Sequence, residues 1–329
     1  MKRNRQRALL TLARLALVAL GGFASAQAGA QSYPTGPVRI VVPFPAGGGV
    51  DTTGRLIGQK LNEALGKPFV IDNRPGANGM IGSEIVAKSP KDGYTLMVNG
   101  ANFVTTPSLY RKVTYDPIRD YEPISLLSIA PNVLVVHPSL PVKSVKELIA
   151  LAKARPGQVN FAGSGSGSTP HLAAELFNTL ADVDMVHVPY RGTGPAIVGL
   201  MSGEASVMFM PATNAVQLVK AGKLRALAVT SRKRLLALPA LPTIEESGLE
   251  GYESSQWYGM LAPAGAPADI LNTLASHVMK IMQSPDMKQR MTESGNVAVG
   301  STRDAFAEHL RTEFEKWAKV IKRSGARVD

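Results

Sequence analysis

Three short stretches of the sequence combine glycine with hydroxyl side chains and could bind a small anion. They are residues 43–51 (PFPAGGGVD), 163–171 (GSGSGSTPH) and 190–195 (YRGTGP). Glycine lets the backbone come close to a ligand. Each stretch precedes a predicted helix, whose first N–H groups have no intrahelical partner and carry about half a unit of positive charge. Together these features predict an anion site that needs no charged side chain.

A carboxylate fits these stretches better than the phosphate of a nucleotide does. None contains G-x-x-x-x-G-K-[ST], and none contains G-x-G-x-x-G with an acidic residue about 20 positions later. As an alternative, the glycines of any one stretch could simply form a tight turn. Asp51 has an alternative role too, because a carboxylate at the start of a helix stabilises the helix without touching a ligand.

Ser168, His171 and Glu175 have the side-chain types of a nucleophile, a base and an orienting acid. Their spacing places them on one helical face, whereas a catalytic triad needs the histidine aimed at the serine oxygen beside an oxyanion hole. We therefore expect Ser168 and His171 to cap the helix or face a ligand, with an exported serine hydrolase as the minor alternative. The five histidines lack metal-binding spacing, and the absence of cysteine excludes thiolate chemistry. His187, inside an apolar strand, is expected to be a core histidine with satisfied hydrogen bonds.

The N-terminal segment has the pattern of a secretory signal peptide. Residues 1–7 are basic, residues 15–23 are apolar, and small residues at 24–26 and 28–30 offer cleavage after residue 26 or after residue 30. The apolar run is shorter than the ~20 residues that span a bilayer. The sequence therefore predicts a soluble protein that is exported to the periplasm.

The charge of the chain is modest once this segment is set aside. The 329 residues carry a formal net charge of +11, but five basic and no acidic residues lie in the first 26, which leaves +6. Such a field attracts small anions. A nucleic-acid partner is not expected, because no basic cluster is interleaved with stacking aromatic residues.

Apolar strands alternate with amphipathic helices along the rest of the chain. Strands are expected at residues 38–42, 69–72, 94–98, 132–136, 159–162, 185–190, 206–210, 226–230 and 257–262. Helices are expected at residues 50–65, 81–86 and 172–180, and from Ser144, Pro195, Pro267 and Thr302 onward. The alternation predicts an α/β protein with parallel sheets and helices on both faces. Because no linker divides the chain, strands 132–136 and 226–230 are expected to cross between two domains.

Seven long motifs spread over the chain resemble the Bug-type receptors, the periplasmic solute-binding components of tripartite tricarboxylate transporters. The motifs are VVPFPAGGGVD, DNRPGANGMIGSE, KDGYTL, PNVLVVHPSLPVKSVKELIALAKARPG, STPHLAAELF, VDMVHVPYRGTGPA and AGKLRALAVTSRKR. The resemblance implies a type II periplasmic binding protein, a Venus flytrap of two lobes joined by two crossing strands. We expect lobe 1 at residues 33–130 and 227–329, and lobe 2 at residues 131–226. The resemblance also implies capture of a small carboxylate by the first and third loops, often through bridging waters.

The ligand loops of the family match residues 44–51, 164–171 and 190–195 of this chain. The candidate ligand-binding residues are Phe44, Ala46, Gly47, Gly48, Asp51, Ser164, Ser166, Ser168, Thr169, His171, Tyr190, Gly192 and Thr193. The resemblance implies a monomeric binding protein, not an enzyme, that needs no metal or cofactor and delivers its ligand to membrane permease subunits. A ligand sensor for a signalling partner is an alternative on the same fold.

The chain departs from the family at the end of the strand 206–210. Where many relatives have an acidic residue, this chain has Met210. The change favours a more apolar carboxylate over an amino acid as the ligand.

Overall fold

The computed structural model of the chain describes residues 33–328. The predicted signal peptide and both of its cleavage sites lie outside the described residues. The chain divides into the unit Met1–Thr35, of which residues 33–35 are described, and the unit Gly36–Asp329. Every described helix and strand belongs to the second unit. No helix within residues 33–328 has the combined length and hydropathy that spanning a bilayer requires.

Strands and helices alternate through the described residues, as the sequence predicts. The strands are β1 (Val38–Val42), β2 (Phe69–Asn73), β3 (Thr95–Gly100), β4 (Tyr121–Val136), β5 (Asn160–Gly163), β6 (Val186–Pro189), β7 (Val207–Pro211), β8 (Arg225–Val229), β9 (Ser255–Pro263) and β10 (Val297–Ala298). The helices are α2 (Gly49–Leu65), the 3₁₀ turn η1 (Ala77–Gly79), α3 (Met80–Ala87), α4 (Asn102–Leu109), α5 (Val145–Ala154), α6 (Thr169–Ala181), α7 (Thr193–Met201), α8 (Ala212–Lys220), α9 (Ala268–Met282), α10 (Pro285–Glu293) and α11 (Arg303–Ser324).

Capping side chains set the start of several helices. The hydroxyls of Ser144, Ser168, Ser284 and Thr302 each accept a hydrogen bond from the backbone N–H three residues later. The helix expected from Ser144 onward is confirmed as α5, whose Glu147 N–H donates to Ser144 Oγ (3.2 Å). Helix α2 ends at Leu65, and the next residue, Gly66, adopts a left-handed conformation with φ 67° that other residues rarely adopt.

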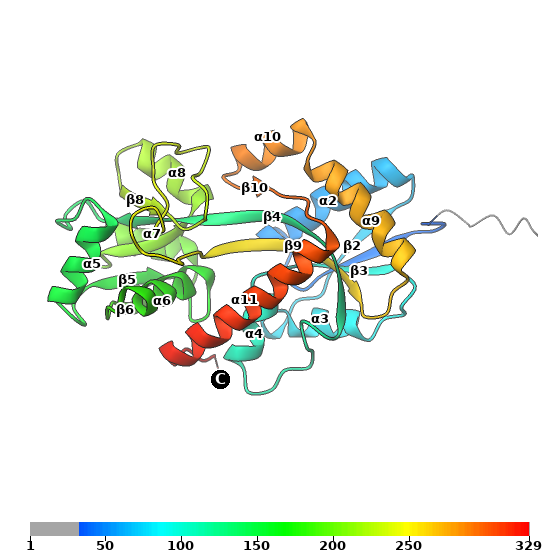
Figure 1. Cartoon of the computed structure of the whole chain (residues 1–329), viewed down its shortest axis with the longest axis horizontal. Coiled ribbons are helices and arrows are strands. Elements are labelled where there is room, and N and C mark those ends of the chain that lie inside the picture. Colours follow the sequence, from blue (N-terminus) through cyan, green and yellow to red (C-terminus); the bar gives the residue numbers. More distant parts are fainter. Residues whose placement is uncertain (1–32, 329) are drawn as a thin grey trace, which may run out of the picture. The chain divides into compact units, whose positions relative to one another are not determined.

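Strand β4 belongs to two sheets. Its first half pairs antiparallel with β9, from Tyr121 opposite Pro263 to Pro131 opposite Ser255, and forms sheet A with the order β2-β1-β3-β9-β4. Its second half pairs antiparallel with β7 and β8 and belongs to sheet B, which continues β7-β5-β6. Figure 1 shows β4 and β9 running side by side between the elements of the two sheets. We call the two halves lobe A and lobe B after their sheets.

The prediction of parallel sheets is right only for the outer strands. β1 pairs in parallel with β2 and β3, and β5 pairs in parallel with β6 and β7. The long central strands β4 and β9 pair antiparallel, as do β8 and β10 with β4. Helix α2 connects the parallel neighbours β1 and β2, and α6 connects β5 and β6, because parallel neighbours need a crossover connection and a helix usually provides it.

The segments that join the lobes differ in part from the predicted ones. Residues 132–136 are the second half of β4, which runs on from sheet A. Strand β8 pairs only with that half, and the chain after Thr230 folds back onto sheet B, where Ile244 donates its N–H to the carbonyl of Val229 (2.9 Å). The chain re-enters sheet A at Ser254, whose N–H donates to the carbonyl of Thr230 (3.0 Å). We therefore propose that lobe B ends near Ser254 and not at residue 226.

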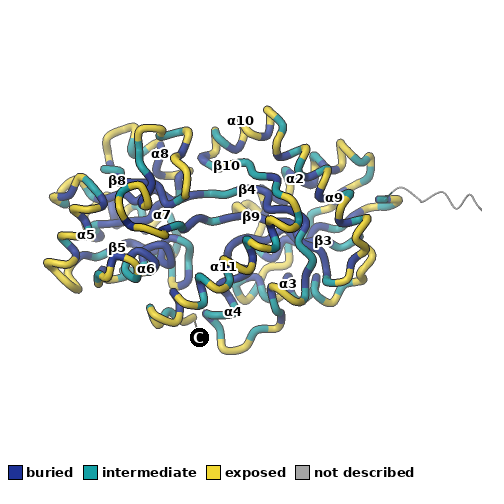
Figure 2. Tube along the Cα trace, in the orientation of Figure 1, coloured by how far each residue is buried: buried dark blue, intermediate teal, exposed yellow. Residues whose placement is uncertain are grey.

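One cluster of buried apolar residues extends from lobe A into lobe B, and a second cluster lies within lobe B. The central strands are buried along most of their length (Figure 2). Helix α11 packs against α4 and β4 and also against α6 of lobe B, with Trp317 only 1% exposed. The two lobes are therefore held together along the side that carries α11.

Candidate ligand-binding cleft

A cavity of about 980 Å³ is lined by residues of both lobes. Its wall includes the starts of α2, α6, α7 and α8, the middle of β4, two residues of β9 and the end of α10. Among the described residues that line it, only Arg290 and Glu293 carry a charge, and both lie on α10. The cavity therefore offers mainly neutral hydrogen-bond donors and acceptors to a ligand.

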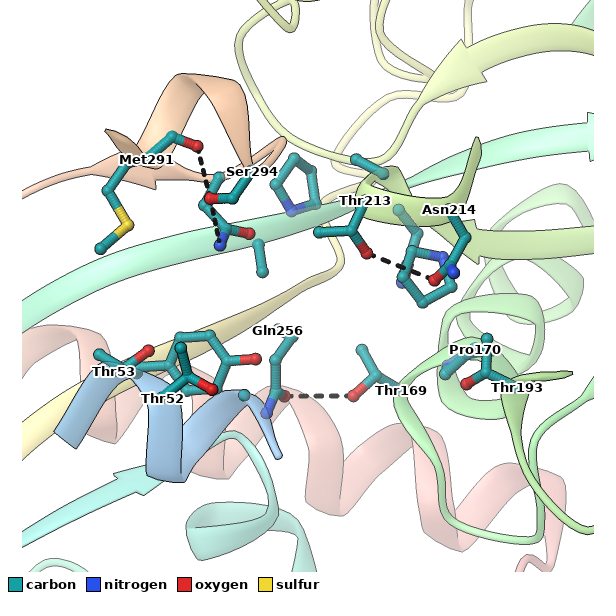
Figure 3. Close-up of a pocket in the computed structure, with 18 of the residues that line it drawn as sticks. Thr52, Thr53, Thr169, Pro170, Thr193, Thr213, Asn214, Gln256, Met291 and Ser294 are labelled. Atoms are coloured by element: carbon teal, nitrogen blue, oxygen red, sulfur yellow. Dashed lines mark hydrogen bonds between the residues drawn. The ribbon is translucent and has the colours of Figure 1, made fainter. Parts of the chain in front are cut away.

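The three glycine-bearing loops meet at this cavity. Gly47 and Gly49 line it from the first loop, Ser164 and Thr169 from the second, and Thr193 from the third. Figure 3 shows Thr52, Thr169 and Thr193 along one wall, beside the first turns of their helices. The starts of three helices thus gather at one wall, where N–H groups without an intrahelical acceptor favour a negatively charged group. In α6 and α7 these groups are few, because Pro170 and Pro195 have no N–H and the N–H of His171 donates to Ser168.

Asp51 holds the first loop in place from the side that faces away from the cavity. Its side chain is 3% exposed and accepts hydrogen bonds from Arg55 Nε (2.9 Å), the N–H of Gly47 (2.8 Å) and Asn73 Nδ2 (2.9 Å). The Arg55 hydrogen bond, helped by Gly47 and Asn73 and opposed by burial, lowers the pKa of Asp51 to about 2. Because the carboxylate is fully engaged, it shapes the loop and does not line the cavity. The helix-stabilising alternative for Asp51 is the one that the structure favours.

Other predicted residues of the first loop also lie outside the lining. Phe44 packs over Gly79, where an added Cβ would come within 3.1 Å of the phenyl ring. Ala46 and Gly48 are exposed next to the lining residues Gly47 and Gly49. A role for these three residues in ligand contact stays a prediction.

The second loop divides into lining residues and supporting residues. Ser164, Ser168 and Thr169 line the cavity, while Ser166 is exposed to solvent. His171 is 5% exposed and points into lobe B, where its ring stacks on His187 at 3.9 Å between centroids.

The hydrogen bonds of His171 do not form a catalytic triad. Its Nδ1 accepts from the N–H of Gly167 (2.9 Å), and its Nε2 lies 3.4 Å from Glu175 Oε1. The hydroxyl of Ser168 accepts from the main-chain N–H of His171, not from its ring (3.4 Å). The expectation of a capping serine is confirmed, and His171 is a structural residue behind the loop.

His187 was predicted to be a core histidine with satisfied hydrogen bonds, and the structure differs in the hydrogen bonds. Its Nε2 is buried and has no hydrogen-bond partner among residues 33–328. Burial, together with the neighbouring His171, lowers the pKa of His187 to about 4. The ring is therefore neutral at physiological pH and packs as an aromatic group.

The third loop lines the cavity with the start of α7 and not with its aromatic residue, Tyr190. Tyr190 lies against Gly199 of α7, where a Cβ would collide with the phenol ring. Gly192 precedes α7 with φ 113°, which glycine adopts without strain, and Thr193 then lines the cavity. The prediction that Tyr190 contacts the ligand therefore has no support in its position.

Met210 does not face the cavity either. Its side chain is 0% exposed and lies in the core of lobe B with Val133 and Ala212. The expectation of a more apolar ligand assumed that Met210 contributes to the ligand site, and this assumption is wrong.

Two residues of β9, Gln256 and Tyr258, line the cavity, and neither was among the candidate ligand-binding residues. Gln256 Oε1 accepts from Thr169 Oγ1 (3.2 Å) and so joins lobe A to lobe B. Tyr258 covers Gly49, where any Cβ would collide with its hydroxyl. Burial raises the pKa of Tyr258, which keeps the phenol neutral and able to donate. Period-two alternation was the available signal, since it places Gln256 and Tyr258 on the face opposite the buried Trp257.

The opposite wall of the cavity also went unpredicted. It holds Asn132 of β4, Thr213 and Asn214 of α8, and Ser294 and Asn296 after α10. Figure 3 shows Thr213, Asn214 and Ser294 on the side away from Thr52 and Thr169. Helix α8 follows β7 directly, without the glycines that marked the other loops. Within residues 33–328, no group of three or more potential metal ligands is close enough to hold an ion.

Comparison with known proteins agrees with this architecture. The model of the tripartite tricarboxylate transporter family receptor matches residues 53–326. Protein BugT of Bordetella pertussis is 36% identical over 315 residues, which are 94% of this chain and 96% of BugT. The structure of R. palustris Rpa4515 with adipate is 38% identical and superposes with a TM-score of 0.74 over 90% of this chain and 100% of that chain. MatC (Rpa3494) from Rhodopseudomonas palustris with bound malate is 31% identical, with a TM-score of 0.71 over 88% of this chain and 100% of that chain. The chain therefore belongs to the Bug-type receptors of the tripartite tricarboxylate transporter family and has their two-lobed periplasmic binding fold.

Proposed function

We propose that this protein is an extracytoplasmic receptor that binds a small organic carboxylate in the cleft and delivers it to a membrane permease. The observation that carries the proposal is the convergence of three helix starts on one wall of a cavity with few charged side chains. Backbone N–H groups at helix starts stabilise an anion without a paired cation. The similar proteins whose structures contain adipate and malate bind ligands of this class.

The residues proposed to contact the carboxylate are those that line this wall. They are Gly47, Gly49, Ser164, Ser168, Thr169 and Thr193, with Tyr258 as a neutral donor from β9. The N–H of Gly47 is already used by Asp51, so Gly47 contributes close backbone approach rather than that donor. The signal-peptide pattern and the family of the chain support a periplasmic location and a permease partner.

Isothermal titration calorimetry of the mature protein against mono-, di- and tricarboxylates, sugars and cationic amino acids tests the proposal. We expect at least one carboxylate to bind and the sugars and cations not to bind. Tight binding of a sugar or a cation, with no carboxylate bound, would contradict the proposal.

A matched pair of glycine variants tests the location of the site. Gly49→Ala places a Cβ where the Tyr258 hydroxyl lies, so it displaces that side chain, and we expect carboxylate affinity to fall by about tenfold or more, or ~1.4 kcal/mol. Gly36→Ala is the control, because nothing lies within 4 Å of its Cβ position. Circular dichroism confirms that both variants are folded. Equal affinities of Gly49→Ala and wild type would remove this loop from the site.

A further inference from the structure

The second ligand loop is supported by a histidine on the side that faces away from the cleft. The N–H of Gly167 donates to His171 Nδ1 (2.9 Å), and this hydrogen bond is buried. Gly167 has φ 75° and lies against Leu109, where an added Cβ would come within 2.8 Å of Leu109 Cδ1. The next residue, Ser168, lines the cleft. The position of this cleft-lining serine therefore depends on an acceptor at His171.

The hydrogen bond from Gly167 requires one protonation state of His171. A ring nitrogen that accepts a hydrogen bond carries no proton, so the proton of the neutral ring is on Nε2. Nε2 lies 3.4 Å from Glu175 Oε1, an acceptor for that proton. A second proton would bind the lone pair of Nδ1. Two N–H groups would then face each other, and Gly167 would lose its acceptor.

Two neighbours act in opposite directions on the charge of His171. The carboxylate of Glu175, on the same helix, stabilises a positive ring. The ring of His187 on β6 stacks at 3.9 Å between centroids, where it excludes water and repels a second charge. Phe161 of β5 stacks on both imidazoles and carries no charge. Glu175 is thus the counter-charge that makes protonation of His171 possible inside lobe B.

The other elements packed against α6 use their charged and titratable groups in contacts that do not involve this ring. Strands β5 and β7 carry no titratable side chain. Tyr252 donates its hydroxyl to a carbonyl of α6 (2.9 Å). Arg323 of α11 lies beside Asp182 (3.4 Å), past the end of α6, and β9 contributes the neutral Gln256. The two neighbours named above therefore set the charge of His171.

His187 supports the start of the same loop. Its ring lies against Gly163, the last residue of β5, where an added Cβ would collide with Nε2. That nitrogen is buried and has no hydrogen-bond partner among residues 33–328. Burial, together with the neighbouring His171, lowers the pKa of His187 to about 4. A proton that the stacked pair takes up above about pH 5 is therefore bound by His171.

We propose that His171 is a positioning residue for the second ligand loop and that its protonation releases Gly167, so that affinity for the carboxylate ligand falls at acidic pH. The proposal rests on the proposed function, because the affinity in question is that of the carboxylate in the cleft. The proton comes from solvent and binds Nδ1, with Glu175 as its counter-charge. The loop responds through Ser168 and Thr169, which line the cleft.

The pH profile of ligand affinity tests the proposal. The probes are adipate and malate, measured by calorimetry from about pH 8 to about pH 5.5, the range in which histidine changes its charge. His171→Asn is measured in parallel and accounts for the protonation of the ligand itself. We expect the dissociation constant of the wild type to rise about tenfold more than that of His171→Asn over this range. Equal rises in the two proteins would overturn the proposal.

Three variants separate the acceptor from the charge. In His171→Asn the amide oxygen can accept from Gly167 and takes up no proton, so affinity at about pH 8 should stay within about threefold of wild type. His171→Leu removes the acceptor and should bind weakly at every pH. His137→Asn is the matched control, because His137 lies outside the cleft lining and contacts Ser139 Oγ (2.7 Å). Wild-type affinity in His171→Leu, or a loss of the pH dependence in His137→Asn, would contradict the proposal.

Nitrogen NMR of the histidine rings tests the same geometry without a ligand. At about pH 8 we expect His171 to carry its proton on Nε2 and none on Nδ1. On acidification Nδ1 should gain a proton while the amide signal of Gly167 shifts with it. The opposite tautomer, or a Gly167 signal that does not follow the titration, would refute the proposal. If neither adipate nor malate binds at any pH, the proposed function loses its support, and this spectrum still decides the role of His171.

Discussion

Asp51 shows why residue types alone did not separate ligand contacts from supporting residues. The glycine loop and its acidic residue were identified from spacing, but the carboxylate turns back to hold Arg55, Gly47 and Asn73. His171 and Tyr190 likewise turn into lobe B. The backbone of a loop is predictable from glycine and helix starts, whereas the direction of each side chain depends on partners far away in sequence.

The pKa of Asp51 makes its contribution to stability depend on pH. The pKa is lowered from 3.8 to about 2 in the folded protein, so the stabilisation is present above the unfolded pKa and is lost as the pH falls from about 4 to about 2. We expect Asp51→Asn to reduce the free energy of unfolding at pH 7 by on the order of 2 kcal/mol. Near pH 2 the variant and the wild type should converge.

Urea denaturation at several pH values measures the Asp51 effect. Glu63→Gln is the control, because Glu63 pairs with Lys60 at an exposed position and such pairs contribute about 0–1 kcal/mol. If Asp51→Asn were as stable as wild type at pH 7, the carboxylate would not organise the loop.

At the scale of elements, the sequence predicted the strands and helices that have a clear period and missed those that do not. The first half of β4 contains Pro123 and Pro131, which argue against a central strand, and its pairing with β9 shifts register between Pro123 and Ser125. Helix α8 follows a strand with no glycine or capping residue to mark it. For the same reason, the sequence predicted the cavity residues of the three glycine-bearing loops and did not predict those of α8 on the opposite wall.

Helix α11 contains a buried carboxylate that joins it to β9. Glu313 is 2% exposed, accepts from the indole N–H of Trp257 (3.3 Å) and of Trp317 (2.8 Å), and pairs with Lys316. We expect Glu313→Gln to lower the free energy of unfolding by about 3 kcal/mol, because it leaves Lys316 with a weakened set of buried partners.

Chemical denaturation of Glu313→Gln is compared with Glu308→Gln on the same helix. Glu308 is 70% exposed and its pair with Arg311 (3.3 Å) should contribute less than about 1 kcal/mol. Similar small losses in both variants would mean that Glu313 is not required to hold α11 on β9.

At the scale of the whole molecule, two linked lobes were expected, and we propose that the chain returns from lobe B near Ser254, later in the sequence than the predicted residue 226. Residues 231–254 have no strong period, and they are held on lobe B by scattered contacts such as the bridge between Val229 and Thr243. These contacts join residues that no local sequence pattern connects, so they cannot be predicted before the strands of sheet B are placed. The overall class and the pair of lobes follow from the alternation of elements, while the boundary between the lobes does not.

The charge of the whole protein is separate from the chemistry of the cleft. The chain carries a formal net charge of +11, yet the described cleft lining holds one cation and one anion. We expect the affinity for a carboxylate to change by less than about threefold between ~0.05 M and ~0.5 M NaCl, since neutral donors inside a cleft are little screened. Calorimetry at the two salt concentrations measures this. A steep loss of affinity with salt would indicate that exposed lysines and arginines hold the ligand.

The shared carboxylate of Glu313 has an optical consequence. The chain has two tryptophans, and the indole N–H of each donates to the Glu313 carboxylate. All indole fluorescence therefore comes from one buried site. Trp257 stands on β9 between Gln256 and Tyr258, whose side chains border the cavity. Any movement of β9 when the cleft fills changes the surroundings of that indole. We therefore expect the tryptophan emission of the native protein to change when the cleft fills, without an attached dye.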